Sequence, residues 1–183
     1  MYQKRLFYPV FKLHDDIRLL WLENVLWTRF FIISAIFSLP DIQSVIQRLL
    51  RNPEDFAKIF RCFYNDKIAK RFEELFSNFL FNVTNMANVV KEENQQNFEN
   101  LRGNCQDSAR ELARFLAHIN PYWNERQLFN LFNEYLGLRA DEVLLIFNGR
   151  YRESIRLFEK IQDQALKTAQ IMISGLIWQF RLI

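Results

Sequence analysis

The sequence predicts an all-α fold in which four long helices pack in a bundle, with two pairs of short crossover helices. Only four glycines and four prolines interrupt the 183 residues, although half of the residues (50%) are apolar. Long stretches repeat their apolar residues with the period of an amphipathic helix, and no alternating run bounded by turn residues suggests a strand. A chain of this length fits one domain with a sizeable core, so residues 1–183 are expected to form a single helical-bundle domain.

The first long helix is expected over residues 14–37. This stretch is strongly apolar but contains Arg18, Glu23 and Arg29. Charged side chains at these depths are costly in the hydrocarbon of a bilayer, so the stretch predicts a core helix and no membrane span. Pro40 follows it, and proline neither continues a helix nor favours a helical conformation in the residue before it.

Two short helices are expected next, over residues 41–50 and 53–63. Asn52 and Pro53 predict the break between them, because asparagine is a favoured N-cap residue and proline suits the first helical position. The acidic residues that follow Pro53 favour the positive end of a new helix. We therefore expect one short crossover helix on each side of this dipeptide.

The second long helix is expected to open at residues 64–66 and to run to about residue 90, before a polar turn over residues 91–96. Its apolar residues recur at helical spacing and define one face of the helix. They are Ile68, Phe72, Leu75, Phe76, Phe79, Val83, Met86 and Val90.

The second half of the chain repeats this order of long and short helices. A long helix is expected to end at Asn120–Pro121, followed by short helices over residues 124–136 and 139–147 and by a long helix over residues 151–180. Gly137 fits the left-handed position that often ends a helix, so it predicts the break inside the second short pair.

Two segments indicate an internal duplication of a helical hairpin. Arg71-Phe72-Glu73-Glu74-Leu75 resembles Leu157-Phe158-Glu159-Lys160-Ile161, which lies 86 positions later. Similarity at a long period constrains the whole architecture, and here it divides the chain into halves of about 14–92 and 95–183. Two amphipathic helices of like composition also align by chance, so duplication is one of two interpretations.

Short motifs are spread along the chain from Leu19 to Phe180. They are Leu19-Leu20-Trp21, Trp27-Thr28-Arg29, Leu39-Pro40-Asp41, Arg48-Leu49-Leu50, Asn52-Pro53-Glu54-Asp55-Phe56, Phe63-Tyr64, Phe115-Leu116, Asn120-Pro121-Tyr122-Trp123 and Gln179-Phe180. Together they resemble an uncharacterised family of small helical bacterial proteins. The resemblance implies a helical bundle of bacterial origin. It implies no dependable activity, because enzyme labels on some relatives, such as amino-acid kinase, do not suit a helical sequence of this kind.

Three positions depart from the pattern of that family. Histidine often occupies the positions of Asn24 and Phe79 in the family, and an acid occupies the position of Gln170. The resemblance therefore implies a metal or polar site between the family's helices whose ligands are missing here. No metal ligand is transferred to this chain.

Charge and cysteine content favour a cytoplasmic protein that does not bind nucleic acid. The net charge of +3 and the pI of about 8.9 are mild, and basic residues stand among acidic ones, as on a solvated helix face. Cys62 and Cys105 stand alone in the sequence, which is typical of reduced thiols in the cytosol. The apolar run after Lys4–Arg5 is too short for a signal peptide.

No catalytic, metal-binding or cofactor-binding motif is recognisable. The only histidines are His14 and His118, and neither belongs to a Glu-x-x-His pair or to a Cys/His cluster that would hold a metal. The glycines are isolated, which excludes an ordinary phosphate-binding loop. Cys105 and His118 would lie about 20 Å apart along one helix, too far for a thiol–imidazole pair. The sequence therefore favours a protein that is not an enzyme, without settling the question.

Polar residues inside apolar helix faces are the remaining candidate site. Asn24 and Thr28 lie one turn apart in the first long helix, and their expected partners across the bundle are Asn82, Thr168 and Gln170. One interpretation is a structural hydrogen-bond network that fixes the register of the helices. The other is the remnant of a ligand site, or a small polar pocket.

Two functional hypotheses follow from these observations. The first is a non-catalytic cytosolic bundle that acts through self-association or protein partners, because aromatic residues are abundant, with 19 phenylalanines, and no reactive group is assembled. The alternative is a metal- or small-ligand-binding four-helix bundle whose polar core site is degenerate in this chain.

Overall fold

Six α-helices make up the part of the chain that the structure describes, and no strand is formed there. The computed structural model describes the backbone of residues 8–91 and 95–182. It also describes their side chains, except those of residues 91, 95–100, 102 and 103. The helices are α1 (Val10–Ile36), α2 (Ile42–Phe63), α3 (Asp66–Lys91), α4 (Gln95–Ile119), α5 (Glu125–Phe147) and α6 (Tyr151–Phe180). The prediction of an all-α helical bundle is confirmed.

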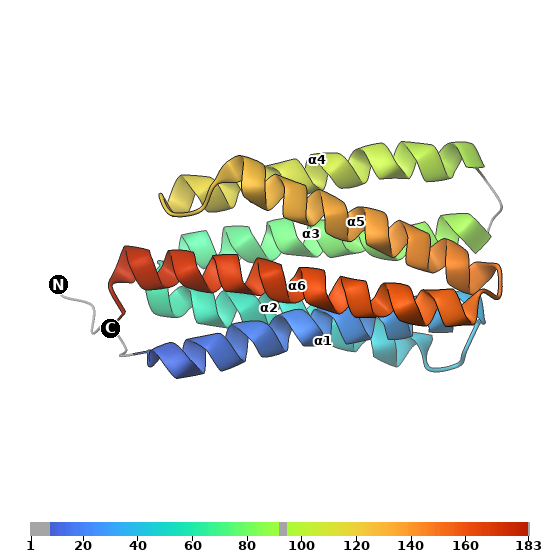
Figure 1. Cartoon of the computed structure of the whole chain (residues 1–183), viewed down its shortest axis with the longest axis horizontal. Coiled ribbons are helices and arrows are strands. Elements are labelled where there is room, and N and C mark those ends of the chain that lie inside the picture. The colour runs from blue at the N-terminus through green and yellow to red at the C-terminus, as the bar shows by residue number, and fades with distance from the viewer. Residues whose placement is uncertain (1–7, 92–94, 183) are drawn as a thin grey trace.

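The six helices form a closed ring. Consecutive helices run in opposite directions, so the start of α1 and the end of α6 lie at the same end of the bundle (Figure 1). Each helix packs against the helices before and after it, and α6 packs against α1. α1, α3 and α5 also contact one another, which places these three around the axis and α2, α4 and α6 outside them. In such a ring every helix buries its apolar stripe against its neighbours.

The expected pairs of short crossover helices are corrected by the structure, because each pair is one continuous helix. α2 runs through Asn52 and Pro53, which are both buried. The Asn52 side chain does not cap a helix and instead donates a hydrogen bond to the carbonyl of Leu20 on α1, at 2.9 Å. Packing against α1 thus outweighs the cost of a proline inside a helix, which is about 3 kcal/mol.

α5 is likewise continuous through Gly137. A Cβ atom added at Gly137 would have no heavy atom within 4 Å, and the residue does not adopt the left-handed conformation that would end a helix. The helix continues because Leu136 and Ala140, on either side of Gly137, are buried in the core. Gly149, by contrast, has a positive φ of 70° in the turn between α5 and α6.

Two asparagines cap helices where the sequence indicates helix starts. The Asn65 side-chain oxygen accepts a hydrogen bond from the backbone N–H of Ile68 at the start of α3, at 2.9 Å. The Asn124 side-chain oxygen accepts one from Gln127 at the start of α5, also at 2.9 Å. Each satisfies a backbone donor that the first turn of a helix leaves free.

The bounds of the long helices differ from expectation at two places. α1 begins at Val10, four residues before the expected start at residue 14. The polar turn expected over residues 91–96 is narrower, because α3 ends at Lys91 and α4 begins at Gln95; the residues between them lie outside the described part of the chain. α6 has the expected bounds.

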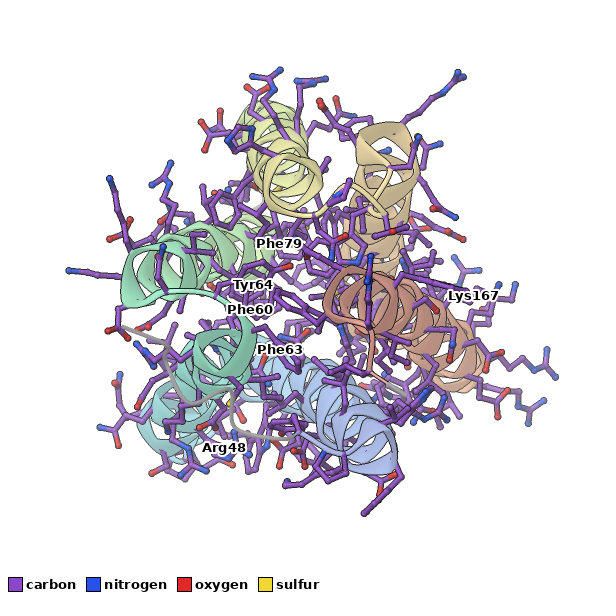
Figure 2. The ribbon with its side chains drawn as sticks, turned by 90° about the vertical axis from the view of Figure 1, so that its left-hand side faces the viewer. Arg48, Phe60, Phe63, Tyr64, Phe79 and Lys167 are labelled. Carbon is purple, nitrogen blue, oxygen red and sulfur yellow. The ribbon has the colours of Figure 1, made fainter. Side chains whose placement is uncertain are left out.

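The core is built from aromatic rings that reach inward from several helices. The Trp21 ring lies 5.6 Å from those of Phe56 and Phe76 and 6.4 Å from that of Tyr135, measured between ring centroids. Phe60 and Phe79 point between the helices, whereas Lys167 points outward (Figure 2). The interior around Trp21 is therefore filled with side-chain carbon.

Trp123, which follows α4, packs against α6. Its side chain is buried, and its indole N–H donates to the carbonyls of Ile171 at 3.1 Å and Met172 at 3.3 Å. A Cβ atom on Gly175 would come within 2.0 Å of the indole nitrogen. Gly175 is therefore required for the close approach of this ring to α6.

Candidate functional site

The five polar residues singled out in the sequence do not come together. Asn24, Thr28 and Thr168 are buried, but Asn82 is half-buried and Gln170 is exposed. No hydrogen bond described in the structure joins any two of the five. The network expected from these particular residues is therefore not formed.

Gln170 and Thr168 make their hydrogen bonds within α6. The Gln170 amide donates to Ser174 at 3.4 Å, and the Thr168 hydroxyl donates to the carbonyl of Gln164 at 3.1 Å. Gln170 is exposed because it lies on the opposite side of α6 from the buried Thr168 and Met172. It is not part of the interior, in contrast to the expectation from its apolar surroundings in the sequence.

Asn24 does belong to a buried network, with partners that the sequence did not indicate. Its side-chain oxygen accepts a hydrogen bond from the Tyr135 hydroxyl at 2.7 Å, and its amide donates to the Asn52 side-chain oxygen at 3.2 Å. Asn52 in turn donates to the carbonyl of Leu20. The three side chains are buried and come from α1, α2 and α5, so the network links three helices of the ring.

A second buried cluster lies about one turn further along α1, where two arginines share one glutamate. Glu142 accepts hydrogen bonds from Arg29 and from Arg139, each at 2.5 Å. Arg139 also donates to the carbonyl of Val25 at 2.9 Å, and Arg29 donates to the hydroxyl of Ser154 at 3.3 Å. Arg139 and Glu142 are fully buried, and the Arg29 side chain is 16% exposed. The cluster thus ties α1 to α5 and α6.

The charges of this cluster are fixed by their surroundings. Burial by itself lowers the pKa of Arg139, but its interactions with Tyr135 and Glu142 outweigh burial and raise the pKa above the ordinary value. Arg139 therefore stays cationic, and two cations face one carboxylate. The Arg139 Nε and the Thr28 hydroxyl have no hydrogen-bond partner within the described residues. Because the cluster joins α1, α5 and α6 through charge-assisted contacts, these contacts depend on the register of the three helices.

The cysteines and acids show no reactive or metal-binding arrangement in the described residues. Burial raises the pKa of the Cys105 thiol to about 12, and burial together with the charge of Asp16 raises the pKa of Cys62. Both thiols are therefore protonated at neutral pH, and a protonated thiol is a poor nucleophile. Within residues 8–91 and 95–182, no three His, Cys, Asp or Glu side chains gather closely enough to hold a metal ion.

The outer face of α1 is apolar and uncovered. Four large side chains on it are exposed to solvent by 39–56%, and Leu22 and Ile33 between them are half-buried. We call these six residues the α1 ridge; they are Leu19, Leu22, Leu26, Phe30, Ile33 and Phe37. Their spacing averages the helical period, so they form one line along the helix.

The α1 ridge carries no unpaired charge. The only charged residues between its ends are Glu23, which pairs with Arg48 at 2.8 Å, and Arg29, which turns inward to Glu142. At the far end of the ridge, the rings of Phe37 and Tyr151 lie 6.3 Å apart, so the exposed surface continues onto the start of α6. Contiguous apolar surface of this kind commonly marks a site of protein or membrane contact.

α1 is also the one helix in the described part of the chain with the length and apolar composition to cross a membrane. Half of its most apolar window is buried inside the bundle, so only the other half faces outward. A core helix with these properties passes the same test. The composition of α1 is therefore weak evidence for a membrane span.

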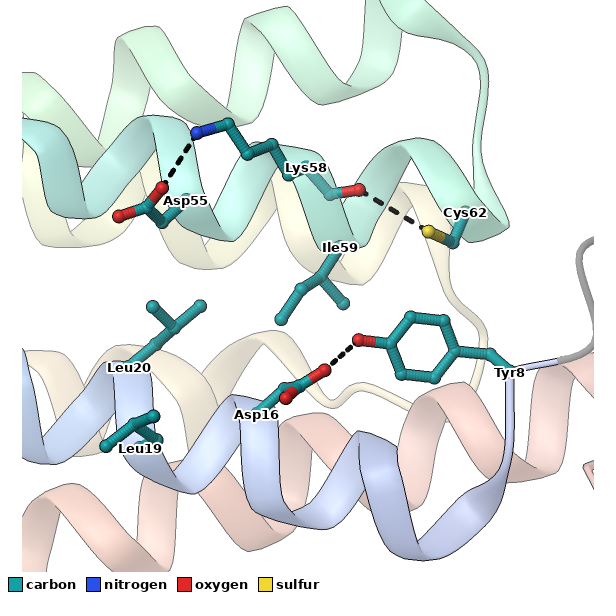
Figure 3. A pocket seen from close by; sticks show the side chains of 8 residues that line it. All are labelled: Tyr8, Asp16, Leu19, Leu20, Asp55, Lys58, Ile59 and Cys62. Carbon is teal, nitrogen blue, oxygen red and sulfur yellow. Dashed lines mark hydrogen bonds and ion pairs between the residues drawn. The ribbon is translucent and has the colours of Figure 1, made fainter.

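A groove lies between the first half of α1 and the second half of α2, and we call it the α1–α2 groove (Figure 3). It encloses a cavity of about 330 Å³, which is within the size range of small-molecule sites. The residues that line it are Tyr8, Asp16, Leu19, Leu20, Asp55, Lys58, Ile59 and Cys62.

Each wall of the groove carries a carboxylate. On α1, Asp16 accepts hydrogen bonds from the Tyr8 hydroxyl and from Lys12, the latter at 2.6 Å. Burial, followed by this contact with Asp16, raises the pKa of Tyr8 well above its ordinary value, so the hydroxyl keeps its proton. On α2, burial alone would raise the pKa of Asp55, but hydrogen bonds from Lys58 and Arg51 outweigh it and lower the pKa. The lowered pKa keeps Asp55 anionic at neutral pH.

Comparison with known proteins gives no identification. No protein-family model matches the chain, and no curated protein or solved structure matches it significantly. No function is therefore transferred from the family that the short motifs resemble, and the functional assignment rests on the surfaces described above.

Proposed function

We propose that this protein is a non-catalytic helical bundle that acts in the cytosol by self-association, with the α1 ridge as the contact surface. The single observation that supports the proposal is the ridge itself: a line of exposed leucine and phenylalanine side chains with no unpaired charge among them. Covering a surface of this composition is favourable, because it lowers the free energy by about 25 cal/mol for each Å² of apolar area removed from water.

The occupant we assign to the ridge is a second copy of the chain. The six residues span about 27 Å along α1, at 1.5 Å per residue, which suits the packing of one helix against another. Two identical ridges related by a twofold axis would place apolar side chains against each other. Like charges would not face each other along the contact, because Glu23 and Arg29 are both neutralised within their own chain.

The experiment is sedimentation of the full chain over a range of concentrations, with a matched pair of variants. Phe30 on the ridge and Phe81 on α3 are both exposed, by 44% and 59%. The native protein is expected to dimerise, Phe30→Glu to be monomeric, and Phe81→Glu to dimerise like the native protein. Circular dichroism should show equal helicity in all three, since neither substitution touches the core.

Two results would overturn the proposal. The first is a native protein that remains monomeric up to high micromolar concentration. The second is a dimer that survives Phe30→Glu or is lost with Phe81→Glu, which would place the contact elsewhere. If the native protein is monomeric, it can be tested for capture of a different protein partner and for flotation with lipid vesicles. Binding of either kind that Phe30→Glu abolishes would reassign the ridge to that occupant.

A small-ligand function is a second candidate, and a specific observation favours it. The expected polar site at the centre of the bundle is occupied by packed aromatic rings around Trp21. The α1–α2 groove, by contrast, is an open cavity between apolar and acidic side chains. Ligand binding is therefore proposed for the groove and not for the core.

The internal duplication also remains a proposal, now of three helices in each half. Its support is the spacing of helix starts: α4, α5 and α6 begin 83–85 residues after α1, α2 and α3 respectively. The packing is less regular, because α1 contacts α3 and α5 across the axis whereas α4 makes no comparable contact with α6 or α2. Relatives whose two halves align better than chance would support duplication, and relatives whose halves do not would count against it.

A further inference from the structure

On its α1 wall, the α1–α2 groove has a carboxylate and an aromatic ring that already contact an ammonium group of the chain. The ammonium of Lys12 lies 2.6 Å from a carboxylate oxygen of Asp16 and 5.5 Å from the centroid of the Tyr8 ring. Carboxylate contact and the face of an aromatic ring are the two interactions that proteins use to hold ammonium groups. The Tyr8 hydroxyl donates to the same carboxylate and so orients it.

The ammonium of Lys12 is a replaceable occupant of this position. Its side chain is 54% exposed, and exposed ion pairs contribute little to stability, about 0–1 kcal/mol. The ammonium of a ligand would make the same contacts, and burial of the ligand's apolar body in the groove would offset the freedom that the ligand loses on binding. Asp16, by comparison, is only 28% exposed and is held on the wall of the groove.

The rest of the groove suits an apolar body attached to that nitrogen. Leu20 and Ile59 face each other from α1 and α2, and both are largely buried from solvent (Figure 3). Beyond them lies the second carboxylate, Asp55, whose partners Lys58 and Arg51 hold it at the opposite end of the cavity. The cationic side chain that lines the groove, Lys58, is thus already engaged by Asp55, and by Glu54 at 3.1 Å. An anionic ligand would find no free cation among the lining residues.

We propose that the α1–α2 groove binds a small organic amine, whose ammonium takes the place of the Lys12 ammonium between Asp16 and Tyr8 and whose apolar body lies against Leu20 and Ile59. This site overlaps the dimer contact proposed above only at Leu19. The amine is held by one charge-assisted contact and by burial of its apolar part.

The test uses three probes of the same shape and different charge on the full chain. The probes are 2-phenylethylamine, the neutral 2-phenylethanol and the anionic 3-phenylpropionate, and binding is followed by ligand-observed NMR titration. The amine is expected to bind at least about tenfold more tightly than the alcohol, which corresponds to one charge-assisted hydrogen bond. The carboxylate is expected not to bind.

Three variants assign the binding to Asp16. Asp16→Asn is expected to weaken amine binding by about tenfold or more, because the charge is lost while the shape is kept. Asp15→Asn, one residue earlier and exposed, is the matched control and should leave binding unchanged. Lys12→Ala should tighten binding several-fold, because it removes the internal competitor. A general loss of structure cannot produce a gain of affinity, so this last variant keeps the test valid if Asp16→Asn folds poorly.

Thiol footprinting places the probe in the groove. Cys62 lines the cavity, whereas Cys105 is buried elsewhere and serves as the internal reference. At pH 9, bound 2-phenylethylamine is expected to slow alkylation of Cys62 by iodoacetamide and to leave the slow alkylation of Cys105 unchanged.

Equal binding of the amine and the alcohol would overturn the proposal, as would amine binding that is indifferent to both Asp16→Asn and Lys12→Ala. The outcome of the amine-binding test does not depend on the proposed self-association. Phe30→Glu should keep amine binding, and Asp16→Asn should keep the oligomeric state, so failure of one proposal is visible without failure of the other.

Discussion

The two faces of α1 differ from those of an ordinary surface helix. The inner face buries the polar side chains Asn24 and Thr28 and directs Arg29 to a buried glutamate, whereas the outer face exposes large apolar side chains such as Leu19 and Phe30. Surface helices usually place the apolar stripe inward and the polar face outward. A helix that is apolar on both sides is normally covered on both sides. The exposed apolar outer face of α1 is the feature on which the proposed self-association rests.

Asn24 and Arg29, on the inner face of α1, find their hydrogen-bond partners within the chain. Asn24 has partners on two other helices, and Arg29 shares Glu142 with Arg139. These contacts exist only when α1, α2 and α5 are in one register, so they favour a single arrangement of the ring over alternatives with similar apolar burial. Substitutions on the inner face should therefore change the free energy of unfolding, and those on the outer face should change association.

The largest effect is expected at Glu142, the carboxylate on which two buried arginines depend. Glu142→Gln keeps the shape but leaves Arg29 and Arg139 without a compensating charge, and loss of one partner in a buried ion pair typically costs about 3–5 kcal/mol. Urea denaturation measures the change in the free energy of unfolding. Glu134→Gln, an exposed position on the same helix, should change it by less than about 0.5 kcal/mol. A Glu142→Gln protein as stable as this control would show that the cluster contributes nothing to stability.

The overall fold could be predicted because it depends on periodic apolar residues, which any packing of helices must bury. The continuity of α2 through Pro53 and of α5 through Gly137 could not be predicted, because it depends on packing that the sequence does not display and that opposes the local preference for a break. A proline or glycine inside a helix costs about 3 or 1 kcal/mol, respectively. Burial of the neighbouring side chains along α2 and α5 exceeds these amounts, so each expected pair of helices is one helix.

The next effect in size is expected at Asn24. Asn24→Leu matches its size but leaves the Tyr135 hydroxyl and the Asn52 side-chain oxygen without their partner in a buried setting, where each unsatisfied group costs about 1–3 kcal/mol. The stability of the variant should fall by at least that amount. The double variant Asn24→Leu with Tyr135→Phe should recover part of the loss, because one of the orphaned groups is then removed. Additive losses in the two single variants would contradict the hydrogen bond between them.

The candidate site was only partly predictable, and the reason is the order of helices in the ring. The position of Asn24 and Thr28 in an apolar stretch correctly indicated buried polar groups. Their partners could not be identified, because α5 was expected as two crossover pieces and not as a full-length neighbour of α1. The spacing of Arg139 and Glu142 within an apolar stretch was an available signal for the buried ion pair.

A smaller effect of opposite sign is expected at Thr28. Its buried hydroxyl has no hydrogen-bond partner within the described residues, unlike that of Thr168. Thr28→Val replaces the hydroxyl with a methyl group of similar size and removes the desolvation penalty, so stability should stay the same or rise by up to about 1 kcal/mol. Thr168→Val, which removes a satisfied hydroxyl, is the matched control and should not be stabilising. A loss of more than about 1 kcal/mol in Thr28→Val would show that the hydroxyl has a partner after all.

The smallest effect on the folded chain is expected on the outer face, at Leu26. Leu26→Gln changes a side chain that is 39% exposed and should alter the unfolding free energy of the monomer by less than about 0.5 kcal/mol. The native protein is nevertheless expected to become more stable as its concentration rises, because association stabilises the folded state by mass action. In Leu26→Gln the concentration dependence should weaken or disappear. Thermal unfolding at several protein concentrations measures both quantities, and a midpoint that is independent of concentration in the native protein would mean that the outer face of α1 remains exposed in solution.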